Sequence, residues 1–283
     1  MVINYNSALE LRAFLEQEKL GMQKKFGQNF LVNPQIRQSL VQELGAQAGD
    51  EVWEIGPGLG AMTALLLEKG LKVKAFEIDH GFIRVLKKIY CENDCFNLVE
   101  GDVLKTWTSH SKPQFLLGNL PYNVAAALLA DFIEKGCIFS RMVVTVQKEV
   151  ALRMAAKAGS ADYSSFSVMC ASVYRVKPLM VIKPSSFYPQ PNVDSMGVLL
   201  ESNGSEAHPV VFYQLVRSLF ASRRKTVKNN LTTFLSSRFG KLQTQDICDS
   251  VLRENSLNGN ERAEKLDYGT FLSLAKSIQN VRL

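Results

Sequence analysis

The chain has 283 residues, of which 46% are hydrophobic and 21% are charged, a composition typical of a globular protein with a sizeable core. No run of 18 apolar residues occurs, and the first 20 residues carry acids and lack the apolar stretch of a secretory signal. We therefore expect a cytoplasmic protein without a membrane span. The net charge is +6, and residues 205–283 contribute +5 of it, with 12 lysines and arginines against 7 acids. This asymmetry indicates a polyanion-binding module attached to a nearly neutral one.

Strand-like and helix-like segments alternate through the first two thirds of the sequence. Residues 1–20 have the pattern of an amphipathic helix, and the alternation begins after Gly49. Strands separated by single helices are typical of a parallel α/β sheet. The predicted strands span 51–55, 71–79, 96–102, 113–119 and 141–147, with further strands at 173–182 and 193–200.

The last quarter of the sequence has a different pattern. A polar stretch at 201–209 precedes four segments that all have helical character, namely 210–222, 224–238, 243–253 and 267–279. We therefore place a domain boundary near 202–208. The prediction is a catalytic domain over 1–204, with a helical extension over 1–20, and a smaller, all-helical, basic domain over 205–283.

A glycine-rich turn follows the first predicted strand of the sheet. In "EIGPGLGA" (54–61), Gly56, Gly58 and Ala61 fit the pattern G-x-G-x-x-G/A, and Glu77 follows at the end of the second strand. Glycines let a ligand approach the backbone, and an acid at this place accepts hydrogen bonds from ribose hydroxyls. On this pattern alone, a nicotinamide-dependent dehydrogenase is one interpretation.

Two further polar positions favour a different ligand. Asp102 closes the third strand, and Asn119 closes the fourth in "GNLPYN" (118–123). In an open α/β sheet, ligands bind at the carboxyl ends of the strands, so Glu77, Asp102 and Asn119 should face one crevice with the glycine turn. An acid for the ribose, an acid for the adenine amine and a glycine turn beside an amino-acid moiety suit S-adenosylmethionine.

A series of motifs makes the chain resemble the ribosomal RNA adenine dimethyltransferase family. The motifs occur in order over nearly the whole chain: "KKFGQNFLVN" (24–33), "EIGPGLGAMT", "FEID", "GD", "GNLPYN", "VQKEVALRM", "FYPQPNVDS" (187–195), "RRKTVKNNL" (223–231) and "RAEKL". Among the branches of the family, the chain most resembles the bacterial small-subunit (16S) enzymes, whose loss gives kasugamycin resistance. The resemblance implies a Rossmann-like, S-adenosylmethionine-dependent methyltransferase, and it leaves the role of residues 1–20 open.

The resemblance also implies a role for the turn after the fourth strand. The exocyclic amine of adenine is a poor nucleophile, and acceptors for its hydrogens localise electron density on the nitrogen. The side-chain oxygen of Asn119 and the carbonyl of Leu120 are the implied acceptors, and Pro121 fixes the turn. Tyr122 offers a ring on which a base can stack. The family pattern places Phe187 as a second aromatic wall.

The implied donor site combines the crevice with a loop near the N-terminus. By analogy with the family, "GQNF" (27–30) folds over the donor. The implied donor-binding residues are Asn29, Leu31, Gly56, Gly58, Glu77, Asp102 and Asn119. No metal site is expected, because the five cysteines and three histidines show no ligand spacing.

A basic run in the last quarter indicates contacts with RNA phosphates. "RSLFASRRKTVKNN" contains no acid, and we predict RNA binding by its cations; a solvated helix face is the other interpretation. Lys24 and Lys25 form a second, less specific basic pair. The residues predicted to bind RNA are Arg217, Arg223, Arg224, Lys225 and Lys228.

The family implies the substrate, and other substrates stay open. The implied acceptors are two adjacent adenosines in a hairpin near the 3′ end of 16S rRNA, in the immature 30S subunit, and we expect the enzyme to act as a monomer during ribosome biogenesis. A large-subunit (23S) rRNA methyltransferase conferring macrolide resistance, a DNA adenine methyltransferase and a non-catalytic ribosome-assembly factor are the alternatives. DNA enzymes typically have D/N-P-P-Y, whereas this chain has Leu120 before Pro121.

Overall fold

The computed structural model describes residues 3–21, 28–240 and 243–281, and these form two compact units. The first unit comprises the ranges 1–131, 139–151 and 176–202, and the second comprises 132–138, 152–175 and 203–283. The last junction, between Ser202 and Asn203, lies next to the predicted boundary at 204/205. The second unit also takes in two earlier segments that the sequence did not indicate. The functions assigned to the two parts stay predictions.

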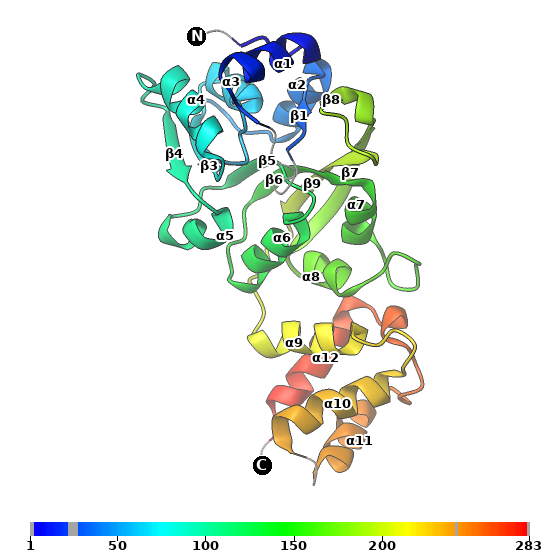
Figure 1. Cartoon of the computed structure of the whole chain (residues 1–283). Coiled ribbons are helices and arrows are strands. Elements are labelled where there is room, and N and C mark those ends of the chain that lie inside the picture. Colours follow the sequence, from blue (N-terminus) through cyan, green and yellow to red (C-terminus); the bar gives the residue numbers. More distant parts are fainter. Residues whose placement is uncertain (1–2, 22–27, 241–242, 282–283) are drawn as a thin grey trace. The chain divides into compact units, whose positions relative to one another are not determined.

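A mainly parallel sheet forms the centre of the first unit (Figure 1). Its strand order is β4-β3-β2-β5-β6-β9-β7, in which β2 to β6 pair in parallel and β9 pairs antiparallel with β6. The bounds are β2 Glu51–Ile55, β3 Lys72–Glu77, β4 Phe96–Glu100, β5 Phe115–Asn119, β6 Arg141–Gln147, β7 Tyr174–Ile182 and β9 Ser195–Ser202. The predicted α/β fold is confirmed, and the observed strand ends differ from the predicted ones by a few residues.

The register of the central strands brings three distant segments to one edge of the sheet. Ile55 of β2 pairs with Phe76 of β3 on one side and with Gly118 of β5 on the other. Gly56, Glu77 and Asn119 each follow one of these residues, so all three lie at the carboxyl edge. The strand order also reverses here, which makes this edge the place where ligands bind in open α/β sheets.

The helices of the first unit begin with α1 (Ala8–Gln17), α2 (Pro34–Glu43), α3 (Ala61–Glu68), α4 (His80–Tyr90) and α5 (Val103–Thr106). Helix α2 was not predicted, although the Asn33 side chain caps it by accepting from the Ile36 N–H and Pro34 occupies its first turn. Leu40, Val41 and Leu44 of this region pack into a core with residues of α3 and of the sheet. A two-residue strand, β1 (Phe30–Leu31), pairs antiparallel with β8 (Phe187–Tyr188).

Helices α6 (Ala125–Glu134) and α7 (Lys148–Ala155) follow β5 and β6 along the chain. The second unit contains α8 (Ser165–Val173), which was not predicted, and four further helices: α9 Val210–Phe220, α10 Val227–Phe239, α11 Thr244–Glu254 and α12 Tyr268–Gln279. Within the described ranges, no helix is long and apolar enough to cross a membrane. None of the five cysteines, all of which lie within the described ranges, forms a disulfide.

Candidate functional site

A pocket of about 310 Å³ opens at the carboxyl edge of the central strands. Its volume lies in the range of sites for small ligands. The pocket brings together ten of the residues predicted for catalysis and donor binding: Asn29, Leu31, Gly56, Gly58, Glu77, Asp102, Asn119, Leu120, Pro121 and Tyr122. Glu77 and Asn119 are the last residues of β3 and β5, and Gly56, Gly58 and residues 120–122 lie in the turns that follow β2 and β5.

The glycine turn and Glu77 are joined by hydrogen bonds. Gly56 and Gly58 have φ values of 68° and 59°, which side chains rarely adopt. A Cβ at Gly58 would also lie 2.9 Å from the ring of Phe30. The Gly58 N–H donates to Glu77 Oε2 at 3.0 Å, and Glu77 Oε1 accepts from the backbone N–H groups of Ile78 and Asp79. The turn therefore holds the Glu77 carboxylate at the pocket wall.

Two buried carboxyls line the pocket, and both have raised pKa values. Burial raises the pKa of Glu77 to about 7, against the effect of its three backbone hydrogen bonds, which lower it. Burial likewise raises the pKa of Glu54 to about 7, although Thr63 Oγ1 donates to this carboxyl at 2.7 Å and lowers it. Both groups therefore titrate near neutral pH. The sequence had indicated only Glu77.

Asp102 lines the pocket and also caps a short helix. Its Oδ1 accepts a 3.0 Å hydrogen bond from the Leu104 N–H and so caps α5, a helix of four residues. Gly101, just before it, has a φ of 116°. The cap uses one carboxylate oxygen, and the proposed contact of Asp102 with an adenine amine stays a prediction.

The Asn-Leu-Pro-Tyr turn is fixed from several directions. The Asn119 Nδ2 donates to the Asn29 carbonyl at 2.8 Å. The Leu120 N–H donates to the Thr145 carbonyl of β6, and the Pro121 carbonyl accepts from the N–H groups of Val124 and Ala125 at the start of α6. The Leu120 side chain is buried against Gly118, where a Cβ would lie 2.7 Å from Leu120 Cδ2. The sequence "GNL" therefore needs its glycine for close packing.

The two aromatic residues predicted to enclose a base have different surroundings. Tyr122 lies at the pocket, and its hydroxyl forms a 2.5 Å hydrogen bond with Ser195 Oγ. Phe187 is not among the residues that line the pocket. It is 2% exposed and packs in the core with Leu31, its partner in the β1–β8 pair. Its role as a second wall stays a prediction.

Besides Glu54, Arg37 and Gln28 are polar residues of the pocket lining that the sequence did not single out, although Gln28 lies in the predicted donor loop 27–30. Arg37 of α2 is 4% exposed, although nothing in the helical pattern of its segment marks it out. Gln28 donates from Nε2 to Asp79 Oδ2 at 3.0 Å, while Asp79 Oδ1 caps α4. The sequence did carry a signal for the cap of α4, because Asp79 stands directly before the first residue of this helix. Lys24 and Lys25, predicted as a basic pair, lie outside the described residues.

The basic run of the second unit is not one helix. Helix α9 ends at Phe220 and α10 begins at Val227, so Arg223, Arg224 and Lys225 all lie in the exposed turn between them, whereas the predicted helix 224–238 includes Arg224 and Lys225. The turn is fixed by Asn230, whose Nδ2 donates to the carbonyls of Leu219 and Ser222. A buried amide that bridges two carbonyls requires a bend here.

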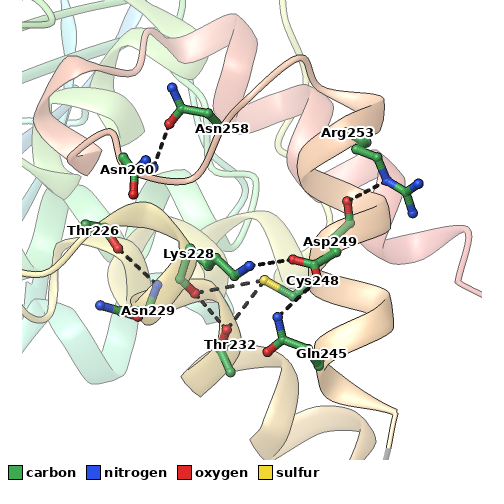
Figure 2. Close-up of polar contacts among 10 residues, drawn as sticks. All are labelled: Thr226, Lys228, Asn229, Thr232, Gln245, Cys248, Asp249, Arg253, Asn258 and Asn260. Carbon is green, nitrogen blue, oxygen red and sulfur yellow. Dashed lines mark hydrogen bonds and ion pairs between the residues drawn. The ribbon is translucent and has the colours of Figure 1, made fainter.

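The five cations predicted to bind RNA differ in how they are held. Arg217 pairs with Glu134, and Arg223 donates from Nη2 to the carbonyls of Ala161 and Tyr163 and to Glu264. Figure 2 shows Lys228 paired with Asp249 at 2.7 Å, and Gln245 also donates to Asp249. This pair raises the pKa of Lys228 and lowers that of Asp249. Arg224 and Lys225 are exposed and form no ion pair with the described residues.

Among the described residues, no group of three or more His, Cys, Asp and Glu side chains is arranged to hold a metal ion.

The parallel sheet, the glycine turn and the polar residues at the carboxyl edge define a Rossmann-like methyltransferase. Solved structures support this class. A dimethyladenosine transferase from Plasmodium falciparum superposes with a TM-score of 0.74 at 28% identity, over 86% of this chain and 94% of that one. The 23S rRNA methyltransferase ErmE has the same fold, with a TM-score of 0.63 at 18% identity over 88% and 99% of the two chains.

Sequence comparisons identify the family within this class. Residues 20–280 match the ribosomal RNA adenine dimethylase family, and the chain belongs to it. A ribosomal RNA small subunit methyltransferase A from Treponema denticola is 47% identical over 97% of this chain and 96% of its own length. The protein of the same name from Treponema pallidum is 40% identical over 98% of both chains. The protein is therefore an rRNA adenine dimethyltransferase, and its family and fold imply the use of S-adenosylmethionine.

The residues of the pocket fit this methyl donor. Gly56 and Gly58 line the pocket and carry no side chains that would keep a ligand from the backbone of the turn. The Glu77 carboxylate lies at the end of β3, where ribose hydroxyls are bound in this class of sheet, and Asp102 follows β4 with one oxygen outside its cap.

Proposed function

We propose that this enzyme transfers methyl groups from S-adenosylmethionine to the exocyclic N6 of two adjacent adenosines in a hairpin near the 3′ end of 16S rRNA. The substrate would be the immature 30S subunit, the product N6,N6-dimethyladenosine, and the place of action the cytoplasm, with the enzyme acting as a monomer. The extensive identity to proteins named ribosomal RNA small subunit methyltransferase A supports the small-subunit substrate.

The observation that carries the chemistry is the orientation of Asn119. An amide that donates through Nδ2 to the Asn29 carbonyl presents its Oδ1 as an acceptor on the other side. Because Pro121 uses its carbonyl to start α6, the acceptor that joins Oδ1 in our proposal is the carbonyl of Leu120. Two acceptors for the amine hydrogens aim the nitrogen lone pair without prior removal of a proton.

The remaining residues of the proposed site bind and orient. The donor supplies a methyl group on a positively charged sulfur, an activated leaving group. Gly56, Gly58, Glu77 and Asp102 hold the donor, together with Asn29 and Leu31. Tyr122 stacks on the target base, and Ser195 holds the ring by its hydroxyl. Rate enhancement then comes from positioning and from fixed dipoles rather than from acid–base catalysis.

Incubation of the protein with labelled donor and different acceptors tests this proposal. We expect dimethyladenosine in 16S rRNA of immature 30S particles, and none in 23S rRNA or duplex DNA. Stronger labelling of 23S rRNA or of DNA than of 16S rRNA would show that the proposed substrate is wrong. Tight binding of 30S particles with unmodified adenosines would instead indicate an assembly factor.

A further inference from the structure

The N-terminal arm, residues 3–20, packs against the rest of the first unit. Ser7 caps α1 by accepting from the Glu10 N–H, and Leu11 and Leu15 of this helix are 1% and 4% exposed. They form a cluster with Leu59 of the glycine turn and with Phe82 and Val85 of α4. In Figure 1, α1 is the dark blue helix drawn next to α3. The family match begins at residue 20, so all of the arm except Leu20 lies outside it.

The arm also bonds to the backbone of the glycine turn. The hydroxyl of Tyr5 donates to the Leu59 carbonyl at 2.9 Å. Burial raises the pKa of Tyr5 to about 12, so the hydroxyl stays protonated and remains a donor at neutral pH. Tyr90 of α4 donates to the next carbonyl, that of Gly60, at 3.3 Å. These bonds lie directly after Gly58, whose N–H holds Glu77.

Arg37 anchors the start of the arm beside the pocket. Its Nη1 donates to the carbonyls of Tyr5 and Leu31, at 3.0 and 2.6 Å, and its Nη2 donates to Asn6 Oδ1 at 2.5 Å. No carboxylate pairs with Arg37 among the described residues, and its buried Nε has no hydrogen-bond partner there. A buried cation held by carbonyls of two distant segments ties those segments together, because loss of either would leave it unsatisfied.

We propose that the N-terminal arm is a buttress of the donor pocket and that Tyr5 and Arg37 are positioning residues for the methyl donor. Tyr5 does not line the pocket, and it supports the turn that holds Gly58 and Glu77 through its bond to the Leu59 carbonyl. Arg37 links Tyr5 and Asn6 to Leu31, which holds the donor together with Asn29 in our proposal. This inference rests on the proposed function, since it assigns the pocket to that donor.

The test measures the binding of S-adenosylmethionine and S-adenosylhomocysteine by calorimetry, together with KM and kcat. Tyr5→Phe removes one hydroxyl and keeps the ring in its cluster, so we expect donor Kd and KM to rise about 2- to 12-fold, the range for one lost hydrogen bond, with kcat unchanged. Arg37→Met should raise them further, and Arg37→Lys should restore part of the loss. Tyr5→Phe should add little in the Arg37→Met background, because the arm is then already released.

Arg12→Ala is the matched control on the same helix, because Arg12 is exposed and pairs with Glu16 of α1. We expect parent affinity for the donor in this variant. If the parent binds the donor and Tyr5→Phe and Arg37→Lys bind it equally well, the role of the arm is wrong and the proposed function stands. If the parent binds no donor, the proposed function itself fails. A general loss of folding would lower kcat in Tyr5→Phe and leave KM unchanged, which would also contradict positioning.

Discussion

The side chain of Asn119 donates to the backbone carbonyl of Asn29, 90 residues earlier in the chain, at 2.8 Å. This bond joins the turn assigned to the target amine with the segment assigned to the donor. It also fixes the orientation of the Asn119 amide, in which Nδ2 donates to Asn29 and Oδ1 is the atom that can accept a hydrogen bond from the target amine. The two halves of the proposed reaction site are therefore coupled through one side chain.

Asn119→Ala should separate chemistry from binding. The variant loses the proposed acceptor of the amine, and a lost site of this kind costs about 2.7–4 kcal/mol in the transition state, or roughly 10²–10³-fold in rate. Single-turnover methylation of 30S particles measures this loss, and calorimetry should show a much smaller loss of donor affinity, about 2- to 12-fold, from the missing bond to Asn29. Asn119→Asp retains an acceptor but loses the N–H donor to Asn29, so we expect an intermediate rate. Methylation by Asn119→Ala at the parent rate would refute the site assignment.

Tyr122 allows stacking to be separated from ring placement. Tyr122→Ala removes the proposed stacking surface, which contributes roughly 1–3 kcal/mol per base, so KM for the RNA should rise by about 5- to 150-fold. Tyr122→Phe keeps the ring and loses only the bond to Ser195, so its effect should be several-fold at most. Equal effects of the two substitutions would show that the hydroxyl, not the ring face, is what matters.

Glu77 should make stability and donor binding depend on pH in opposite directions. Its pKa in the folded protein, about 7, lies above the ordinary value of 4.5, so the native state holds this proton more tightly than the unfolded chain does. Its contribution to stability is therefore present below pH 4.5 and is lost as pH rises to about 7, by up to about 3 kcal/mol. Donor affinity should rise over the same interval, because ribose hydroxyls need the ionised acceptor.

Glu77→Gln tests both parts of that expectation. Denaturant unfolding at pH 5.5 and pH 8 should show a smaller decrease in stability for the variant than for the parent. Glu54, with its own pKa of about 7, leaves a residual dependence in both proteins. Donor affinity should be lower in Glu77→Gln at pH 8 and nearly independent of pH. An unchanged pH profile would mean that Glu77 does not titrate in this range.

Arg224 and Lys225 should contribute to RNA affinity without affecting stability. Both lie in the exposed turn after α9, and neither is engaged in an ion pair with the described residues. Substitution of either by Ala should weaken 30S binding and lower the slope of log K against log salt by about 0.7–0.9 for each lost phosphate contact. Arg253→Ala, an exposed cation on α11 whose Nε donates to Asp249 O, is the control and should keep the parent slope (Figure 2).

Arg223 should behave differently from its two neighbours. Its bonds to Ala161, Tyr163 and Glu264 connect three segments of the second unit, so Arg223→Ala should lower the thermal midpoint as well as RNA affinity. Thermal unfolding of the three Ala variants compares them directly. A midpoint equal to that of Arg224→Ala would show that these partly exposed bonds contribute little to stability.

The sequence by itself determined that a parallel sheet forms, how its strands alternate with helices along the chain, and most of the residues of the pocket. Apolar runs, helical spacing and glycine turns are local signals, and the parallel topology then places the end of every strand at one edge. Gly56, Glu77, Asp102 and Asn119 could be assigned to one crevice for this reason. Helix α2 was not predicted, although Asn33 and Pro34 are the N-cap and first-turn residues that mark the start of a helix in a sequence.

Only the tertiary structure decided which polar groups meet across long separations. Arg37 has carbonyl partners at Tyr5 and Leu31, and a carbonyl leaves no trace in the pattern of side chains. In the basic run, the sequence predicted two helices, but the bonds from the Asn230 amide to the Leu219 and Ser222 carbonyls, which fix the turn between them, carry no sequence signal. Phe187 packs in the core through its pairing with Leu31, which depends on the register of β1 and β8. Such contacts depend on where the folded backbone brings its own N–H and C=O groups, and residue identity alone does not encode that position.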